Sequence, residues 1–103
     1  MAKSFIIGSV DRIPIGEGRN FIVEQKKIAV FRTHPGEVYA TQAACPHRNG
    51  PLADGLLGGA TIVCPLHDRS FDLRTGAGVG LDCASLKIYP VALTETSQLM
   101  ATL

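Results

Sequence analysis

Two short segments, each with a cysteine followed closely by a histidine, constrain this chain more than any other feature. The first, "ACPHRNG", carries Cys45 and His47, and the second, "VCPLHDRSF", carries Cys64 and His67. The chain has only three cysteines and three histidines in 103 residues, so most of both kinds fall in these segments. Thiolates and imidazoles are soft or borderline ligands that suit zinc or an iron–sulfur cluster. The pattern therefore indicates a metal centre.

The spacing of the four ligands disfavours a structural zinc site. Tetrahedral zinc modules usually pair two cysteines at one knuckle and two histidines on a helix. Here each segment supplies one cysteine and one histidine, as C-x-H and C-x2-H, and no helix is predicted to carry paired histidines. Zinc, in a structural or interaction module, stays open as the minority interpretation.

The length and the charge of the chain indicate one domain without a bulk electrostatic partner. A chain of 103 residues has a common domain size and can bury a core without disulfides. Its formal charge of +1 argues against nucleic acid or a membrane surface as the partner. The N-terminal apolar run is too short for a signal peptide, and no segment approaches the ~20 apolar residues of a membrane span. Because an odd number of cysteines fits a reducing compartment, we expect a cytoplasmic protein.

Apolar residues recur with the short, alternating pattern of strands rather than helices. Residues 27–43 read as a hairpin with a type II turn at Pro35 and Gly36, and a second turn is predicted at 94–97. His34, in the first turn, is expected to be solvated. Strands are predicted at residues 4–10, 20–25, 26–33, 38–44, 60–64, 69–73, 86–93 and 98–103. The chain is therefore predicted to be all-β.

Glycine and proline crowd the region from Cys45 to about residue 82, which predicts a loop-rich subregion. Phe71 and Leu73 alternate with polar residues there and are expected to pack under the second Cys/His segment. Gly50 and the glycines from 76 to 80 serve either turns or a close backbone approach to the metal centre. "GAGVG" has no βαβ unit around it, so it does not indicate a phosphate-binding loop. No catalytic residue and no small-molecule substrate are predicted.

The motif C-P-H-x16-C-P-L-H, followed by "SFDLRTG", resembles the Rieske-type [2Fe–2S] proteins, and the resemblance covers most of the chain. It implies one [2Fe–2S] cluster, with Cys45 and Cys64 on one iron and His47 and His67 on the other. It also implies an antiparallel β sandwich or barrel as a base, residues 1–44 and 83–103, with a cluster-binding subdomain inserted at about 45–82. Ligand loops at 45–50 and 64–69 would form the tip. Two neutral imidazoles in place of two thiolates make the cluster less anionic, which raises its reduction potential.

The ligand loops depart from those of the high-potential members of that family. Those members carry an extra cysteine in each loop, where this chain has Gly50 and Leu66. They also place a serine and a tyrosine where this chain has Arg69 and Phe71, so fewer hydrogen bonds should reach the cluster sulfurs. The resemblance therefore implies a low-potential, ferredoxin-like protein. Cys83 follows a covering loop that lacks a proline common in the family, and it is expected to be a free, partly buried thiol.

The resemblance implies a carrier of single electrons, or a non-catalytic subunit of an oxidoreductase, that works through the tip around His47 and His67. An apolar patch rimmed by charges is expected there, made of Pro46, Leu52, Pro65 and Leu66 with Arg48, Asp68 and Arg69. The chain most resembles the small subunit of NAD(P)H-dependent nitrite reductase. The alternative is the ferredoxin component of a multicomponent aromatic-ring-hydroxylating dioxygenase. The expected redox partners are a flavin reductase, a nitrite reductase large subunit or a terminal oxygenase.

Overall fold

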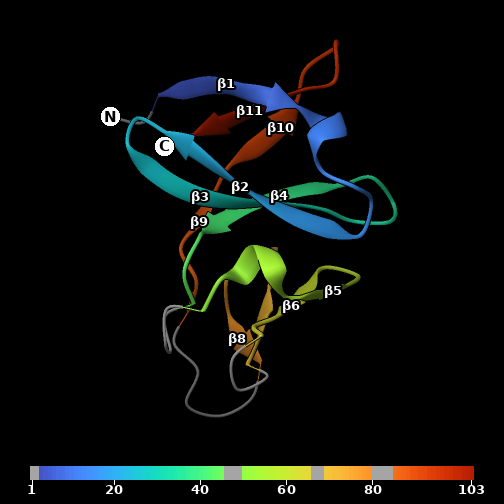
Figure 1. Ribbon diagram of the computed structural model, residues 1–103, viewed down its shortest axis with the longest axis vertical. Helices are drawn as coiled ribbons and strands as arrows, with labels where there is room; N and C mark the ends of the chain where they lie inside the picture. The colour runs from blue at the N-terminus through green and yellow to red at the C-terminus, as the bar shows by residue number, and fades with distance from the viewer. Residues whose placement is uncertain (1–2, 46–49, 66–68, 80–84) are drawn as a thin grey trace.

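Three antiparallel sheets make up the protein (Figure 1). The computed structural model describes residues 3–45, 50–65, 69–79 and 85–103, and these form strands and two short 3-10 helices but no α-helix. The predicted all-β, antiparallel fold is thus confirmed. Across these residues, no helix has the length and apolar character that crossing a membrane would require.

The middle sheet has the order β2-β3-β4-β9 and is covered on both faces. Its strands are β2 (Glu17–Val23), β3 (Lys26–Arg32), β4 (Val38–Gln42) and β9 (Ile88–Tyr89). Residues 28–31 of β3 are all apolar because this strand is buried on both faces. Ile28 and Val30 face one core cluster, and Ala29 and Phe31 face a second one. This strand therefore lies at the centre of the molecule.

The second sheet, β1-β11-β10, packs on one face of the middle sheet, at the top of Figure 1. It consists of β1 (Ser4–Ser9), β11 (Gln98–Thr102) and β10 (Val91–Leu93). The 3-10 helix η1 (Val10–Arg12) connects β1 to β2. The first core cluster fills the space between these two sheets, with Val10, Ile13, Phe21, Val23, Ile28, Val30, Ala40, Tyr89, Leu99 and Ala101 as its buried members.

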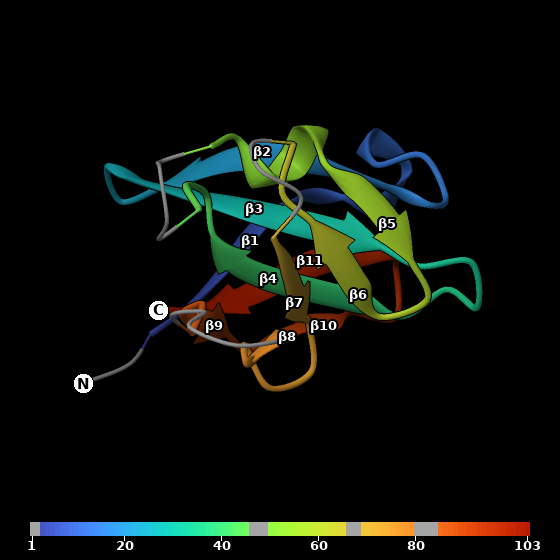
Figure 2. The ribbon, with the colours of Figure 1, turned by 90° about the horizontal axis from the view of Figure 1, so that it is seen from below.

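The third sheet, β5-β6-β7-β8, covers the opposite face of the middle sheet. Figure 2, seen from the side of this sheet, shows β6 and β7 in front of β3 and β4. Its strands are β5 (Leu56–Gly58), β6 (Thr61–Val63), β7 (Ser70–Asp72) and β8 (Gly78–Val79), and the 3-10 helix η2 (Leu52–Asp54) precedes them. The predictions located β6 and β7 but missed β5 and β8, which are short and rich in glycine.

The strand predicted at 86–93 is in fact two strands that belong to different sheets. β9 pairs with β4, whereas β10 pairs with β11, and Pro90 separates them. Proline has no N–H for a ladder, but its carbonyl accepts a hydrogen bond from Thr102 N at 2.8 Å. The chain therefore crosses from the middle sheet to the second sheet at this proline.

The predicted hairpin at 27–43 is confirmed, but its turn is of another kind. β3 and β4 pair from Ile28 with Gln42 to Arg32 with Val38. Thr33 N donates to Glu37 O, Gly36 N donates to Thr33 O, and Gly36 has a φ of 96°. This is a three-residue loop ending in a glycine bulge, not a type II turn. The predicted turn at 94–97 is confirmed as a loop with the same hydrogen bonds.

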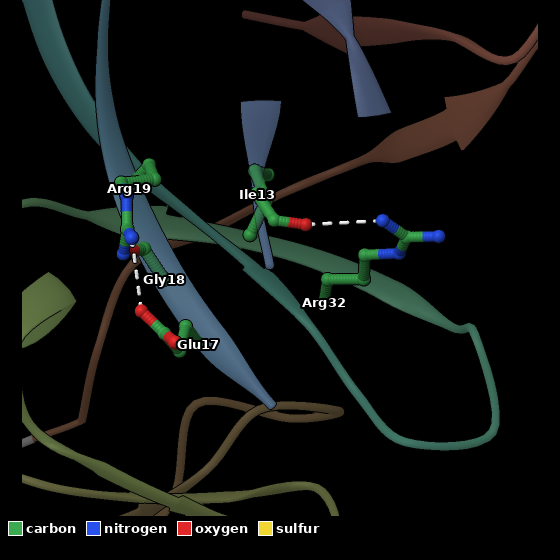
Figure 3. Close-up of polar contacts among 5 residues, drawn as sticks. All are labelled: Ile13, Glu17, Gly18, Arg19 and Arg32. Carbon is green, nitrogen blue, oxygen red and sulfur yellow. Dashed lines mark hydrogen bonds and ion pairs between the residues drawn. The ribbon is translucent and has the colours of Figure 1, made fainter. Parts of the chain in front are cut away.

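Arg32, the last residue of β3, connects that strand to the backbone at the end of η1. Its Nη1 donates to the carbonyl of Ile13 at 3.1 Å, as Figure 3 shows. In the same view, Arg19 forms an ion pair with Glu17 at 2.9 Å on β2. The Arg32 hydrogen bond connects β3 to the segment that passes from the second sheet to the middle sheet.

The two-residue turn between β2 and β3 stores backbone strain. Val23 pairs with Lys26, and Glu24 and Gln25 have φ values of 51° and 68°. A type I′ turn needs positive φ at both central residues, which Asn-Gly adopts at least cost. We expect Glu24→Asn with Gln25→Gly to raise the free energy of unfolding by about 1–2 kcal/mol, measured by denaturant unfolding.

The matched control for this turn is the loop at 94–97. Glu95 and Thr96 have no positive φ there. Glu95→Asn with Thr96→Gly should therefore give no stabilisation. An equal gain in both loops would show that backbone strain at residues 24 and 25 is not the cause.

Candidate metal centre

The first Cys/His segment forms a loop that leaves the end of β4. Ala44 and Pro51 pair across its base in an isolated antiparallel bridge. Cys45 N donates a hydrogen bond to Gly50 O at 2.8 Å, which closes a loop over residues 45–50. Its bounds match the predicted ones. Cys45 is fully buried.

The second Cys/His segment forms a loop of the same length between β6 and β7. Val63 pairs with Ser70 at its base, and Cys64 N donates to Arg69 O at 2.6 Å. The loop therefore spans residues 64–69, again as predicted. Cys64 is also fully buried. Each cysteine is thus the first residue of a six-residue loop that the same hydrogen bond closes.

The fold brings the two cysteines into one core cluster. The buried members of this second cluster are Ala29, Phe31, Cys45, Leu52, Ala53, Ile62, Cys64, Phe71, Leu73 and Leu86. Phe71 and Leu73 pack with Cys64 there, as predicted. Two thiols at the starts of twin loops, shielded from water by apolar side chains, fit a centre in which one iron takes two thiolates. His47, His67 and Cys83 lie outside the described residues, so their predicted roles stay predictions.

Gln42 positions the start of the first loop, a role that the sequence did not predict. Its Nε2 donates to Ala44 O at 2.7 Å, directly before Cys45. Its Oε1 accepts from Lys87 N at 2.8 Å, and its own N donates to Lys87 O. One amide side chain therefore ties the loop to the strand segment that enters β9. Nothing in the sequence distinguishes this glutamine from an exposed one.

Arg74, in the turn after β7, lies near Tyr39 of β4. The Tyr39 hydroxyl donates to Glu37 Oε1 at 3.0 Å, and Arg74 N donates to the Asp72 carboxylate at 2.8 Å. The pKa of the Arg74 guanidinium is raised, first by its hydrogen bond with Tyr39 and then by the charges of Tyr39 and Asp72.

One prediction about this region needs correction. Leu52 was expected in an exposed apolar patch, but η2 places it in the second core cluster with no exposed surface. Of that patch, Pro65 is exposed as expected, while Pro46 and Leu66 lie outside the described residues. Gly76 has a φ of 81°, and a Cβ there would overlap with the carbonyl oxygen of Leu86. The absence of a side chain at Gly76 thus lets its backbone lie close to the backbone of residue 86.

Residues 3–90 match the Rieske [2Fe–2S] domain family, which is most of the chain. The chain belongs to this family. As a Rieske protein it is an electron-transfer protein, and its cofactor is one [2Fe–2S] cluster. The matched residues include Cys45 and Cys64, the two buried cysteines described above.

Dioxygenase ferredoxins and a nitrite reductase small subunit, the two groups that the sequence motifs suggested, are both found among the proteins similar to this chain. The ferredoxin component of the naphthalene 1,2-dioxygenase system of Pseudomonas aeruginosa is 39% identical over 85 residues, 79% of this chain and 78% of that protein. The solved ferredoxin of Sphingomonas yanoikuyae B1 has a TM-score of 0.85 at 31% identity, over 98% of this chain and 99% of that one.

A Mycobacterium tuberculosis protein described as an NADH-dependent nitrite reductase small subunit superposes with a TM-score of 0.88. The superposition covers 100% of this chain and 96% of that one, at 20% identity. At this identity the likeness shows a shared Rieske fold. Sequence identity is thus higher with the dioxygenase ferredoxins.

Proposed function

We propose that the chain is the ferredoxin component of a multicomponent dioxygenase, carrying single electrons from a flavin reductase to a terminal oxygenase in the cytoplasm. The observation that carries the proposal is the 39% identity with a dioxygenase ferredoxin of which the chain covers 78%. The nitrite reductase small subunit, favoured by the sequence motifs alone, is the alternative that the test below separates. The odd number of cysteines supports a reducing compartment.

The proposed ligands are Cys45 and Cys64 for one iron and His47 and His67 for the other. The support is the burial of both cysteines and the equal length of the two loops that they begin. The proposed domain division is a base of residues 1–44 and 83–103 with an insertion at about 45–82. In support, β5 to β8 all lie between residues 56 and 79, whereas the other two sheets use strands before residue 43 and after residue 87.

Bound between the loops, the cluster would accept and release one electron at a time. The protein would hold the two thiolates in a packed site that excludes water, so that the surrounding side chains rearrange little when the charge of the cluster changes. The hydrogen bonds from Cys45 N to Gly50 O and from Cys64 N to Arg69 O fix the base of each loop. Gln42 holds the first loop from the side of β9. The middle sheet thus serves as a rigid support for the site.

The test is reconstitution with defined partners. The holoprotein is mixed with NADH, the flavin reductase and the terminal oxygenase of a naphthalene 1,2-dioxygenase system, and product formation is measured with and without it. Turnover that depends on the added protein supports the proposal. Absence of turnover, together with co-purification of the chain with a large sirohaem subunit, would replace it with the nitrite reductase function.

Phe71→Tyr is expected to raise the reduction potential. Phe71 lies in the second core cluster with Cys64, 1% exposed, where high-potential relatives carry a tyrosine that donates to the cluster. A hydrogen bond of ~1.4 kcal/mol that favours the reduced state corresponds to about 59 mV for one electron. Protein-film voltammetry measures the shift. Phe21→Tyr, in the first core cluster, should leave the potential unchanged. Equal shifts in both variants would contradict this role for residue 71.

A further inference from the structure

The two ligand loops belong to different sheets. The loop that begins at Cys45 leaves β4 of the middle sheet, whereas the loop that begins at Cys64 connects β6 to β7 in the third sheet. Two thiolates that bind one iron must keep a fixed separation, because a binding constellation tolerates displacements of only ~0.5 Å. The fold therefore has to hold the first loop in place relative to the third sheet.

Gln42, the last residue of β4, contributes its side chain to the ladder between β4 and β9. The register of these strands places Gln42 opposite Lys87. Residues at such a position of an antiparallel pair exchange two backbone hydrogen bonds. Here Gln42 N donates to Lys87 O at 2.9 Å, but Lys87 N donates to the side-chain Oε1 of Gln42 at 2.8 Å. The Gln42 carbonyl accepts from Thr41 Oγ1 at 2.7 Å. The amide oxygen of Gln42 thus takes the role of a backbone carbonyl.

The other end of the same amide group holds the first ligand loop. Gln42 Nε2 donates to Ala44 O at 2.7 Å. Ala44 pairs with Pro51 across the base of the loop, and the next residue is Cys45. An amide carries both a donor and an acceptor, so it can bridge a carbonyl and an N–H, which a carboxylate cannot do. Gln42 therefore connects the base of the first loop to the backbone at residue 87.

The backbone beside Lys87 is in turn fixed to the third sheet. Leu86 N donates to Gly76 O at 2.7 Å, and Gly76 N donates to Asp72 O, at the end of β7. The side chain of Leu86 is buried in the second core cluster, which also contains both cysteines. β7 begins directly after the second ligand loop. A continuous path of hydrogen bonds and short backbone segments thus runs from β7 through residues 86–87 and Gln42 to the first loop.

We propose that Gln42 is a positioning residue for the metal centre. Its side chain sets the place of Cys45 relative to Cys64, because it joins the first ligand loop to backbone that is fixed to the third sheet. The inference rests on the proposed ligands and adds a residue that acts through Cys45. Partners of this kind, which hold the ligands of a metal, typically contribute about tenfold to a hundredfold to metal binding.

Two variants separate the two ends of the amide. Gln42→Met has a side chain of similar length and lacks both contacts. Gln42→Glu can still accept from Lys87 N, but its carboxylate cannot donate to Ala44 O. Gln98→Met is the matched control, since it makes the same exchange on β11 of the second sheet. Ile13→Val, in the first core cluster, removes one buried methylene group and lowers stability away from the site.

Three measurements on each cluster-loaded variant provide the readout. Loss of the visible absorbance in excess EDTA gives the rate of iron release, thermal unfolding gives the stability, and EPR of the dithionite-reduced protein gives the g values. We expect Gln42→Met to release iron about tenfold faster than the wild type or more, and Gln42→Glu to change in the same direction. Both should shift the g values. Gln98→Met and Ile13→Val should stay within about twofold of the wild type and keep its g values.

Each alternative result has a definite meaning. Wild-type iron release and g values in Gln42→Glu would overturn the inference, because that variant loses the donor to Ala44 O. Equal acceleration in Gln42→Met and Ile13→Val would also overturn it, since a loss of fold stability would then explain the release. The measurements use no redox partner, so a failed dioxygenase reconstitution leaves the inference standing. A wild type that holds no iron would refute the proposed ligands and, with them, this role of Gln42.

Discussion

Cys64→Ala is expected to abolish the cluster, whereas Cys83→Ala keeps it. Cys64 is fully buried at the start of its loop, and no other thiol is available in the second core cluster except Cys45 among the described residues. A [2Fe–2S] centre that loses one of two thiolates on the same iron has no replacement ligand. Iron and acid-labile sulfide should fall from about two of each per chain to background, with loss of the visible absorbance.

The histidine ligands are tested in the same way. His67→Ala should lose bound iron, whereas His34→Ala should not, because His34 is an exposed residue of the β3–β4 loop. Elemental analysis and an EPR spectrum of the dithionite-reduced protein provide the readout. A normal cluster in His67→Ala or in Cys64→Ala would overturn the ligand assignment. A colourless, iron-free wild type after anaerobic reconstitution would remove the basis of the proposed function.

Gly55→Ala is expected to lower the stability of the protein strongly. Gly55 has an ordinary φ of −76°, so the backbone conformation itself admits an alanine. A Cβ at this position would, however, overlap with the carbonyl oxygen of Val63, the residue before Cys64. Backbone in a paired strand cannot move aside as a flexible side chain can. We expect a loss of about 3 kcal/mol, the upper end for overpacking.

Gly58→Ala is the matched control. Gly58 is the last residue of β5, which begins directly after Gly55, and a Cβ at Gly58 would meet nothing within 4 Å. Thermal unfolding of the two variants isolates the contact with Val63, because both replace glycine by alanine in extended backbone. A loss of ~3 kcal/mol corresponds to roughly 12–24 °C in a domain of this size. Similar melting temperatures for the two variants would show that the third sheet adjusts to the added methyl group.

The β3–β4 hairpin of the middle sheet could be predicted well because the residues that specify it are close together in the sequence. β3 and β4 were located from their apolar residues and from the turn residues between them, Pro35 and Gly36. β5 and β8 could not be, because two or three residues rich in glycine carry no periodic signal. Leu52 was predicted to lie on the surface for a related reason. A single apolar residue after a proline in a glycine-rich region can be exposed or buried, and only the packing of η2 on the middle sheet buries it.

By itself, the sequence determined the chemistry of this protein. The type and spacing of Cys45, His47, Cys64 and His67 predict a donor set that few metal centres use, and that prediction depends on residue identity alone. The tertiary structure decided what depends on segments distant in the chain: the burial of both cysteines in one cluster and the hydrogen bonds of Gln42 to the first loop and to Lys87. These contacts form only when β3, β4 and β9 pair, because strand pairing joins residues as distant in the chain as Ala40 and Tyr89.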